Sequence, residues 1–178
     1  ACMELIDYYK IDVRGMNITI IGCSNLVGLP LSMLLLQSGA TITLCHIDTT
    51  NTKEHCLLSD MVISCCGVPH LVKEDWISKG TIVIDIGINR LKESNKLVGD
   101  VDYDNVKHKC NYITPVPGGV GPVTIIMLLF SYGPFLSLSK YQLANGLVYI
   151  AIISVILKII YEFQNNYESY NILNPMRH

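Results

Sequence analysis

NITIIGCSNLVGLP, residues 17–30, is the stretch of sequence that decides the fold. Its first five residues, 17–21, are β-branched except for one asparagine, and the run stops at Gly22, which predicts a buried strand. A short loop follows, and residues 30–37 then have the composition of a helix that ends at Gly39. A strand, a glycine loop and a helix in this order are typical of the first unit of a parallel sheet.

The same alternation continues outward from this stretch. The other expected strands are continuous apolar runs, a pattern typical of a parallel sheet that helices cover on both faces. Since the crossovers of such sheets are right-handed, we predict an α/β fold with a doubly wound, mostly parallel, Rossmann-like sheet. The remaining strands are expected at 41–45, 61–65, 81–86 and 111–113, and the remaining helices at 3–9, 51–58, 73–78, 103–109 and 123–130, the last of them buried.

Four loops follow the carboxyl ends of the first four predicted strands, where ligands of such sheets bind. These loops are 22–28, 45–50, 66–70 and 87–90. The first presents backbone N–H groups and a helix N-terminus to an anionic group, although Gly22 and Gly28 stand six apart and do not form the G-x-G-x-x-G pattern. Any tight turn from a strand to a helix also uses glycine, so this loop alone fits either interpretation.

A second unusual loop, 114–122, contains three prolines and three glycines. We expect no regular element there, because the glycines permit close approach of the backbone to a ligand and the prolines stiffen the chain. Asp85 and Asp100 fall near the same edge of the sheet. The simplest expectation for their carboxylates is turn and loop hydrogen bonding.

Composition excludes several classes of protein. The chain has 178 residues, of which 50% are hydrophobic, and this suits one domain or one domain with an appendage. The formal net charge is -2 and the Lys and Arg residues form no basic run, so no nucleic-acid partner is expected. The seven cysteines include no C-x-x-C pair and the histidines show no ligand spacing, so we expect free thiols and no metal site.

Taken together, four stretches resemble the methylenetetrahydrofolate dehydrogenase/cyclohydrolase family, over a region from about Met3 to about Leu129. They are 20–30, 85–90, 98–101 and 112–124, and the last is the family's most distinctive signature. The resemblance implies a two-domain enzyme that uses NADP or NAD to oxidise 5,10-methylenetetrahydrofolate to the methenyl form, which bifunctional members hydrolyse to 10-formyltetrahydrofolate. It also implies a tetrahydrofolate derivative as substrate, a homodimer, and a location in the cytoplasm or the mitochondrial matrix.

The resemblance further assigns roles around the cofactor. Gly22, Cys23 and Ser24 would face its ribose-phosphate part, Pro69 would wall the pocket, and Ile88 would contact the nicotinamide side. Gly118, Gly119 and Thr124 would line the cleft between cofactor and folate. The full expected cofactor-binding set is Gly22, Cys23, Ser24, Val27, Gly28, Ile47, Asp48, Gly67, Pro69, Ile88, Gly119 and Thr124.

Two of these residues depart from the family pattern. Cys23 stands where the family usually has an Arg that pairs with the 2′-phosphate of NADP, and such a bond contributes roughly 1.5–3 kcal/mol. Asp48 follows the strand 41–45, where the family often has a Ser and a basic residue. Asp48 would repel a 2′-phosphate and could accept from a 2′-hydroxyl, so we hypothesise that NADP preference is weakened and NAD is tolerated. A solvated loop carboxylate is the other interpretation of Asp48.

No residue of this chain is expected to be catalytic. The resemblance places the catalytic Lys and its Tyr partner in an N-terminal domain that we expect to be missing here, and 1–14 would be the helix leading out of it. Residues 15–130 would form the NAD(P)-binding domain. Two alternatives stay open: a catalytically incomplete dinucleotide-binding fragment, and a membrane-tethered binding module.

The segment 131–178 is expected to be a divergent tail, hydrophobic and helical at first and then polar. Residues 131–134 are expected to interrupt the preceding helix, and Tyr141 to Leu157 carries no charge. As a helix this run would span roughly 25 Å, a little less than the hydrocarbon core of a bilayer. Three interpretations stay open: a marginal transmembrane anchor, a helix buried against another domain, and a sequence from alternative splicing or an imperfect gene model. Residues 164–178 are expected to be disordered.

Overall fold

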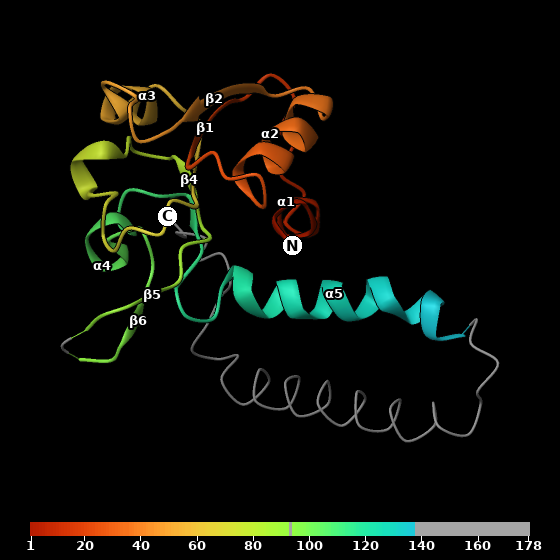
Figure 1. The fold of residues 1–178 in the computed structure, drawn as a ribbon. Helices are drawn as coiled ribbons and strands as arrows, with labels where there is room; N and C mark the ends of the chain where they lie inside the picture. The colour runs from red at the N-terminus through yellow and green to blue at the C-terminus, as the bar shows by residue number, and fades with distance from the viewer. Residues whose placement is uncertain (93, 138–178) are drawn as a thin grey trace.

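The computed structural model describes residues 1–92 and 94–137. Its centre is a sheet of five parallel strands in the order β2-β1-β3-β4-β7 (Figure 1). The strand order changes direction between β1 and β3, which creates the switch point where ligands of such sheets bind. The predicted α/β fold with a doubly wound sheet is therefore confirmed. The strands are β1 (Asn17–Ile21), β2 (Thr41–Cys45), β3 (Met61–Ser64), β4 (Ile82–Asp85) and β7 (Tyr112–Ile113).

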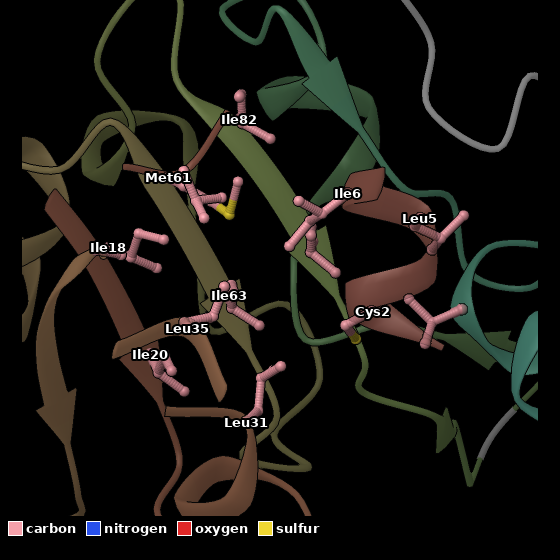
Figure 2. Packing of buried hydrophobic residues seen from close by; sticks show 14 residues of the cluster. Cys2, Leu5, Ile6, Ile18, Ile20, Leu31, Leu35, Met61, Ile63 and Ile82 are labelled. Atoms are coloured by element: carbon pink, nitrogen blue, oxygen red, sulfur yellow. The ribbon is translucent and has the colours of Figure 1, made fainter. Parts of the chain in front are cut away.

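Helices cover both faces of the sheet. Successive residues of each strand point to opposite faces, so each strand contributes side chains to two hydrophobic cores. Along β3, Met61 and Ile63 belong to one hydrophobic core and Val62 belongs to the other. Leu5 and Ile6 of α1 lie with Leu31 and Leu35 of α2 in the first core (Figure 2). That first core is covered by α1 (Cys2–Tyr8), α2 (Gly28–Gln37) and the start of α5 (Val120–Ser137), and the second by α3 (Thr52–Leu57), the 3-10 turn η1 (Glu74–Trp76) and α4 (Tyr103–Val106).

Two predicted helices are shorter in the structure and one pair of strands was not predicted, whereas the limits of β1 and β2 match the prediction. The expected helix 73–78 is only the turn η1, which follows a parallel bridge between Val72 and Val101. The expected helix 103–109 ends at Val106 and continues as turns. A small antiparallel pair, β5 (Asn89–Arg90) and β6 (Leu97–Val98), was not predicted, because two-residue strands leave no run to detect.

Helix α5 corrects three expectations. The loop that was expected to be irregular through residue 122 ends earlier, since α5 begins at Val120 and Pro122 lies in its first turn, where a missing N–H costs nothing. The helix also continues through 131–134, so the expected interruption at these residues is wrong. It is not buried either: Ile125 is 48% exposed and Phe130 is 73% exposed. The apolar composition of the helix favours burial, but it does not show which other element, if any, would cover the helix.

The remaining expectations about the tail lie outside the described residues. These are the uncharged run Tyr141 to Leu157 and the polar segment 164–178. Among the residues that the structure does describe, none of the helices has the length and apolar character required to cross a membrane.

Candidate functional site

The loop between β1 and α2 closes on itself, and glycine is required at both of its ends. The Gly22 N–H donates to the carbonyl of Cys45 (2.9 Å), which extends the contact of β1 with β2. Gly22 has φ +109°, and a Cβ there would lie 2.6 Å from the carbonyl oxygen of Cys65. A Cβ on Gly28 would overlap the carbonyl oxygen of Gly22. The two glycines therefore stand six apart because their backbones touch where the loop closes.

This closed loop leaves backbone donors unoccupied at the N-terminus of a ten-residue helix. Ser24 accepts from Val27 through its hydroxyl (3.2 Å) and from Leu29 through its carbonyl (3.1 Å). Within the described residues, the backbone N–H groups of Cys23, Asn25 and Gly28 have no acceptor. Free N–H groups beside a helix N-terminus, with no acidic residue in the first turn, favour an anionic ligand.

The turn after β2 lies beside this loop, because Ile21 and Cys45 are partners in the parallel register. The Asp48 N–H donates to Nδ1 of His46 (3.1 Å), and the Asp48 carboxylate lies 3.6 Å from the same nitrogen. The side chain of Asp48 is 86% exposed, and Ile47 is 99% exposed. The turn therefore presents one carboxylate to solvent at the carboxyl edge of the sheet.

A buried carboxylate fixes the end of β3. Asp100 is fully buried, and its Oδ2 accepts from the N–H groups of Cys66 (2.8 Å) and Gly67 (3.1 Å) and from the Ser64 hydroxyl (3.0 Å). Its Oδ1 accepts from the side-chain amide of Asn89 (2.8 Å). Asp100 thus connects the loops after β3 and β4.

Asp85 makes the complementary set of contacts. Its Oδ1 accepts from the N–H groups of Gly87 (2.9 Å) and Asp100 (3.1 Å), and its Oδ2 accepts from the N–H of Val101 (2.8 Å). Burial raises the pKa of Asp85 to about 6, against the opposite effect of these three hydrogen bonds. A Cβ on Gly87 would overlap the Asp100 carboxylate, and one on Gly99 would overlap that of Asp85. The expected loop hydrogen bonding of both carboxylates is confirmed, and together they hold three loops in place.

A cavity of about 780 Å³ opens beside these loops, between α1, α2, the proline- and glycine-rich loop and the start of α5. Its walls are mostly apolar, and Asp85 and Thr124 supply polar groups. Figure 1 shows α1 close to the first turns of α5, on the side of the sheet that α2 covers. A Cβ on Gly119 would lie within overlap distance of the Pro115 carbonyl, so the loop needs glycine there to keep this shape.

The structure distributes the expected site residues between this cavity and the loops next to it. Val27, Ile88, Gly119 and Thr124 line the cavity, as does Gly118. The other eight lie outside the cavity, seven of them on loops that follow strands and Gly28 at the start of α2. They are Gly22, Cys23, Ser24 and Gly28 after β1, Ile47 and Asp48 after β2, and Gly67 and Pro69 after β3.

Sequence reasoning missed two parts of the site. The first is the wall formed by residues 1–3 of α1, whose amphipathic spacing predicts burial but not the partner. The second is the contact between Asn89 and Asp100, which joins two segments eleven residues apart. Among the described residues no group of three or more metal-ligating side chains exists, and every cysteine is a free thiol.

Comparison with known proteins identifies relatives of this arrangement. The family model of the tetrahydrofolate dehydrogenase/cyclohydrolase NAD(P)-binding domain matches residues 1–133. The bifunctional protein FolD of Sulfurimonas denitrificans is 57% identical over 127 residues, which are 71% of this chain and 44% of that protein. The mitochondrial C-1-tetrahydrofolate synthase of Saccharomyces cerevisiae is 48% identical over 134 residues, which are 72% of this chain and 14% of that protein.

Solved structures agree. The bifunctional enzyme FolD of Campylobacter jejuni has a TM-score of 0.70 at 49% identity, over 72% of this chain and 45% of that one. The Trypanosoma brucei methylenetetrahydrofolate dehydrogenase-cyclohydrolase, solved with NADP cofactor and inhibitor, has a TM-score of 0.68 at 39% identity, over 72% of this chain and 46% of that one. The chain spans less than half the length of the FolD relatives that it matches. Its matched region shows that the chain belongs to the tetrahydrofolate dehydrogenase/cyclohydrolase family and contains the NAD(P)-binding domain of that family.

Proposed function

We propose that this chain binds NADP or NAD along the carboxyl edge of its sheet, and that the protein to which it belongs oxidises 5,10-methylenetetrahydrofolate to 5,10-methenyltetrahydrofolate. We propose methenyltetrahydrofolate cyclohydrolase activity for the same cleft. Relatives named as bifunctional proteins support both activities, and the relative solved with NADP supports the cofactor. The residues at this edge supply what a dinucleotide requires: donors for its phosphates, an apolar recess for a ring, and a polar group beside a ribose.

The observation that carries the proposal is the loop closed by Gly22 and Gly28. The free N–H groups of Cys23, Asn25 and Gly28 would donate to the pyrophosphate, with the N-terminus of α2 adding its partial positive charge. A Cβ on Gly28 would push the Gly22 carbonyl away and change the direction of these donors. The glycines therefore set the shape of the loop that would receive the anion.

The apolar cavity would hold the nicotinamide ring next to the folate. Its volume of about 780 Å³ falls in the range usual for small-molecule sites. We assign Val27, Ile88, Gly119 and Thr124 to this part of the site, and Gly67 and Pro69 to its rim after β3. The apolar walls would exclude water and hold the two reacting rings against each other, so that a hydride can pass from the methylene carbon. The dinucleotide, when bound, supplies the hydride acceptor.

This chain is not proposed to supply a proton-transfer group. The described walls of the cavity contain no Lys, His, Glu or Tyr side chain. Asp85 lies there, but its carboxylate accepts three hydrogen bonds from backbone N–H groups that it holds in position. Turnover would then require groups outside the described residues, and we propose that the described residues bind the cofactor.

Assembly and location are proposed on resemblance alone. We propose a homodimer in the cytoplasm or the mitochondrial matrix. Sedimentation equilibrium tests the first proposal, and a mass of one chain across micromolar concentrations would exclude it. Fractionation of expressing cells, followed by carbonate extraction of the membranes, tests the second and separates it from a membrane-tethered module.

The binding proposal is tested by titrating the chain with NADH and NADPH while following nucleotide fluorescence. We expect saturable binding of at least one of them, weakened at least tenfold in Gly28→Ala. The control is Gly15→Ala, at the opposite edge of the sheet, where φ is +75° and a Cβ meets nothing within 4 Å, so this variant strains the backbone without contacting the loop. Equal loss in both variants would assign the effect to general destabilisation. No uptake of either nucleotide by the folded chain at millimolar concentration would end the proposal.

A further inference from the structure

We infer that Asp48, in the turn after β2, makes this site select a dinucleotide with a free adenosine 2′-hydroxyl, so that NAD binds in preference to NADP. This inference rests on the proposed function, since it concerns the ribose next to the loop between Gly22 and Gly28. It assigns a specificity-determining role to one exposed side chain. The argument has three parts: where Asp48 lies, what its carboxylate contacts, and which charges surround it.

The position of Asp48 follows from the register of the sheet. Ile21 pairs with Cys45, and the N–H of Gly22 donates to the carbonyl of Cys45 (2.9 Å). The turn that begins at His46 therefore starts directly beside the loop that would hold the pyrophosphate. In doubly wound sheets, the carboxylate that accepts a hydrogen bond from the adenosine ribose lies in this place, at the end of the second strand and some 20 residues after the glycine loop.

The carboxylate of Asp48 has room to accept a ligand hydroxyl. Its side chain is 86% exposed, and among the described residues its one neighbour of opposite potential charge is His46, with Nδ1 at 3.6 Å from Oδ2. That Nδ1 accepts the N–H of Asp48 (3.1 Å), so the ring nitrogen nearest to the carboxylate is already in contact with the backbone. The carboxylate of Asp48 accepts no hydrogen bond from the described residues and keeps open positions for a ligand hydroxyl.

No Lys or Arg is available to receive a 2′-phosphate in this part of the chain. Between Gly15 and Thr52 the sequence contains neither residue, so the loop after β1, α2, β2 and the turn after β2 contain no permanent cation. The next cation, Lys53, is in an ion pair with Asp75. A phosphate monoester carries about −1.5 to −2 charge at neutral pH and is recognised in proteins by Arg or Lys. NADP would therefore lack an attractive partner and meet the charge of Asp48, whereas the hydroxyl of NAD would gain an acceptor.

The test is a fluorescence titration of the chain with NADH and NADPH, in wild type, Asp48→Ser and Asp12→Ser. Ser at position 48 removes the charge and keeps a hydroxyl. Asp12→Ser makes the same change of net charge at an exposed carboxylate before β1, at the other edge of the sheet. We expect wild type to bind NADH at least tenfold more tightly than NADPH, Asp48→Ser to reduce this ratio at least fivefold, and Asp12→Ser to leave it unchanged.

The possible failures are distinguishable. If wild type bound NADPH as tightly as NADH, or more tightly, the inference would be wrong and the proposed function would stand. If wild type preferred NADH but Asp48→Ser kept the same ratio, selection would lie elsewhere and the assignment of Asp48 would be wrong. If neither nucleotide bound to any variant, the proposed function itself would fail and the inference with it.

Discussion

Replacement of Asp100 by Ala should remove the support of the loops after β3 and β4. Two backbone donors, the N–H groups of Cys66 and Gly67, would lose a charged acceptor at 2.8 and 3.1 Å, as would the amide of Asn89. A hydrogen bond to a charged group contributes about 1.5–3 kcal/mol. The Gly67 N–H can recover a bond with water because its residue is exposed. We therefore expect the free energy of unfolding to fall by about 3–5 kcal/mol.

Asp100→Asn is the conservative partner of this variant. The Asn oxygen can take the place of Oδ2, and its NH₂ group can face Asn89 if the amide of Asn89 rotates to present its own oxygen. The expected cost is therefore smaller, about 1–2 kcal/mol. This variant keeps the prediction testable if Asp100→Ala does not fold.

The assay is equilibrium unfolding in urea, followed by circular dichroism and by the fluorescence of Trp76, the only tryptophan of the chain. Asp104→Ala serves as the control, because the side chain of Asp104 is 84% exposed and its one ion pair with a described residue is with Lys107, three residues along. We expect it to cost less than about 1 kcal/mol. If Asp100→Ala cost no more than Asp104→Ala, the reasoning about the buried carboxylate would be refuted.

Three further predictions concern ionisation and surface charge. The pKa of Asp85 is raised from 3.8 to about 6, so its contribution to stability is present below pH 4 and is lost as pH rises through 6, by about 3 kcal/mol. In Asp85→Asn, the free energy of unfolding should therefore depend less on pH between pH 4 and 7. An unchanged pH dependence in this variant would contradict the prediction. Burial raises the pKa of Cys56 and Cys110 to about 12, so Ellman's reagent at pH 8 should modify half-buried Cys23 first. A bound dinucleotide should slow the reaction of Cys23. Equal reaction rates for all thiols would contradict this prediction. Lys53→Ala removes a partly exposed ion pair with Asp75, so it should lower the free energy of unfolding in urea by less than about 1 kcal/mol. A larger decrease would assign this ion pair a structural role.

The parallel strands could be predicted from the sequence because each obeys a local rule. β1 and β2 are apolar or β-branched runs bounded by glycine or polar residues. β1 is buried from Ile18 to Ile21, and a strand buried on both faces has no alternation to confuse the assignment. The loop after β1 was found for the same reason, since Gly22 lies where a strand stops and Gly28 lies where a helix starts. The reason for their spacing was not predictable, because it depends on contact between two backbones.

The parts that were missed depend on contacts between distant segments. The pairing of β5 with β6 joins residues on either side of a turn, and no local pattern marks two-residue strands. The exposure of Phe130 on α5 could not be derived from composition, because an apolar helix is buried only where another element covers it. The first residues of α1 reach the cavity from the far end of the described chain, so only the folded structure shows that they share a wall with the loop at 115–119.

The carboxyl edge of the sheet has two halves: the loops after β1 and β2, and the loops after β3 and β4. Their chemistry differs because their carboxylates differ in burial. After β3 and β4, the carboxylates of Asp85 and Asp100 are buried and occupied by backbone donors, so they hold loops and have little capacity left for a ligand. After β2, the carboxylate of Asp48 is exposed and belongs to a turn without a permanent cation. Backbone donors after β1 act on any phosphate of the ligand, whereas the exposed carboxylate of Asp48 acts on the ribose next to it, so we place the inferred discrimination between dinucleotides in the β1–β2 half. On this inference, changes in the β3–β4 half would alter the shape of the site through its loops and leave the contact at Asp48 in place.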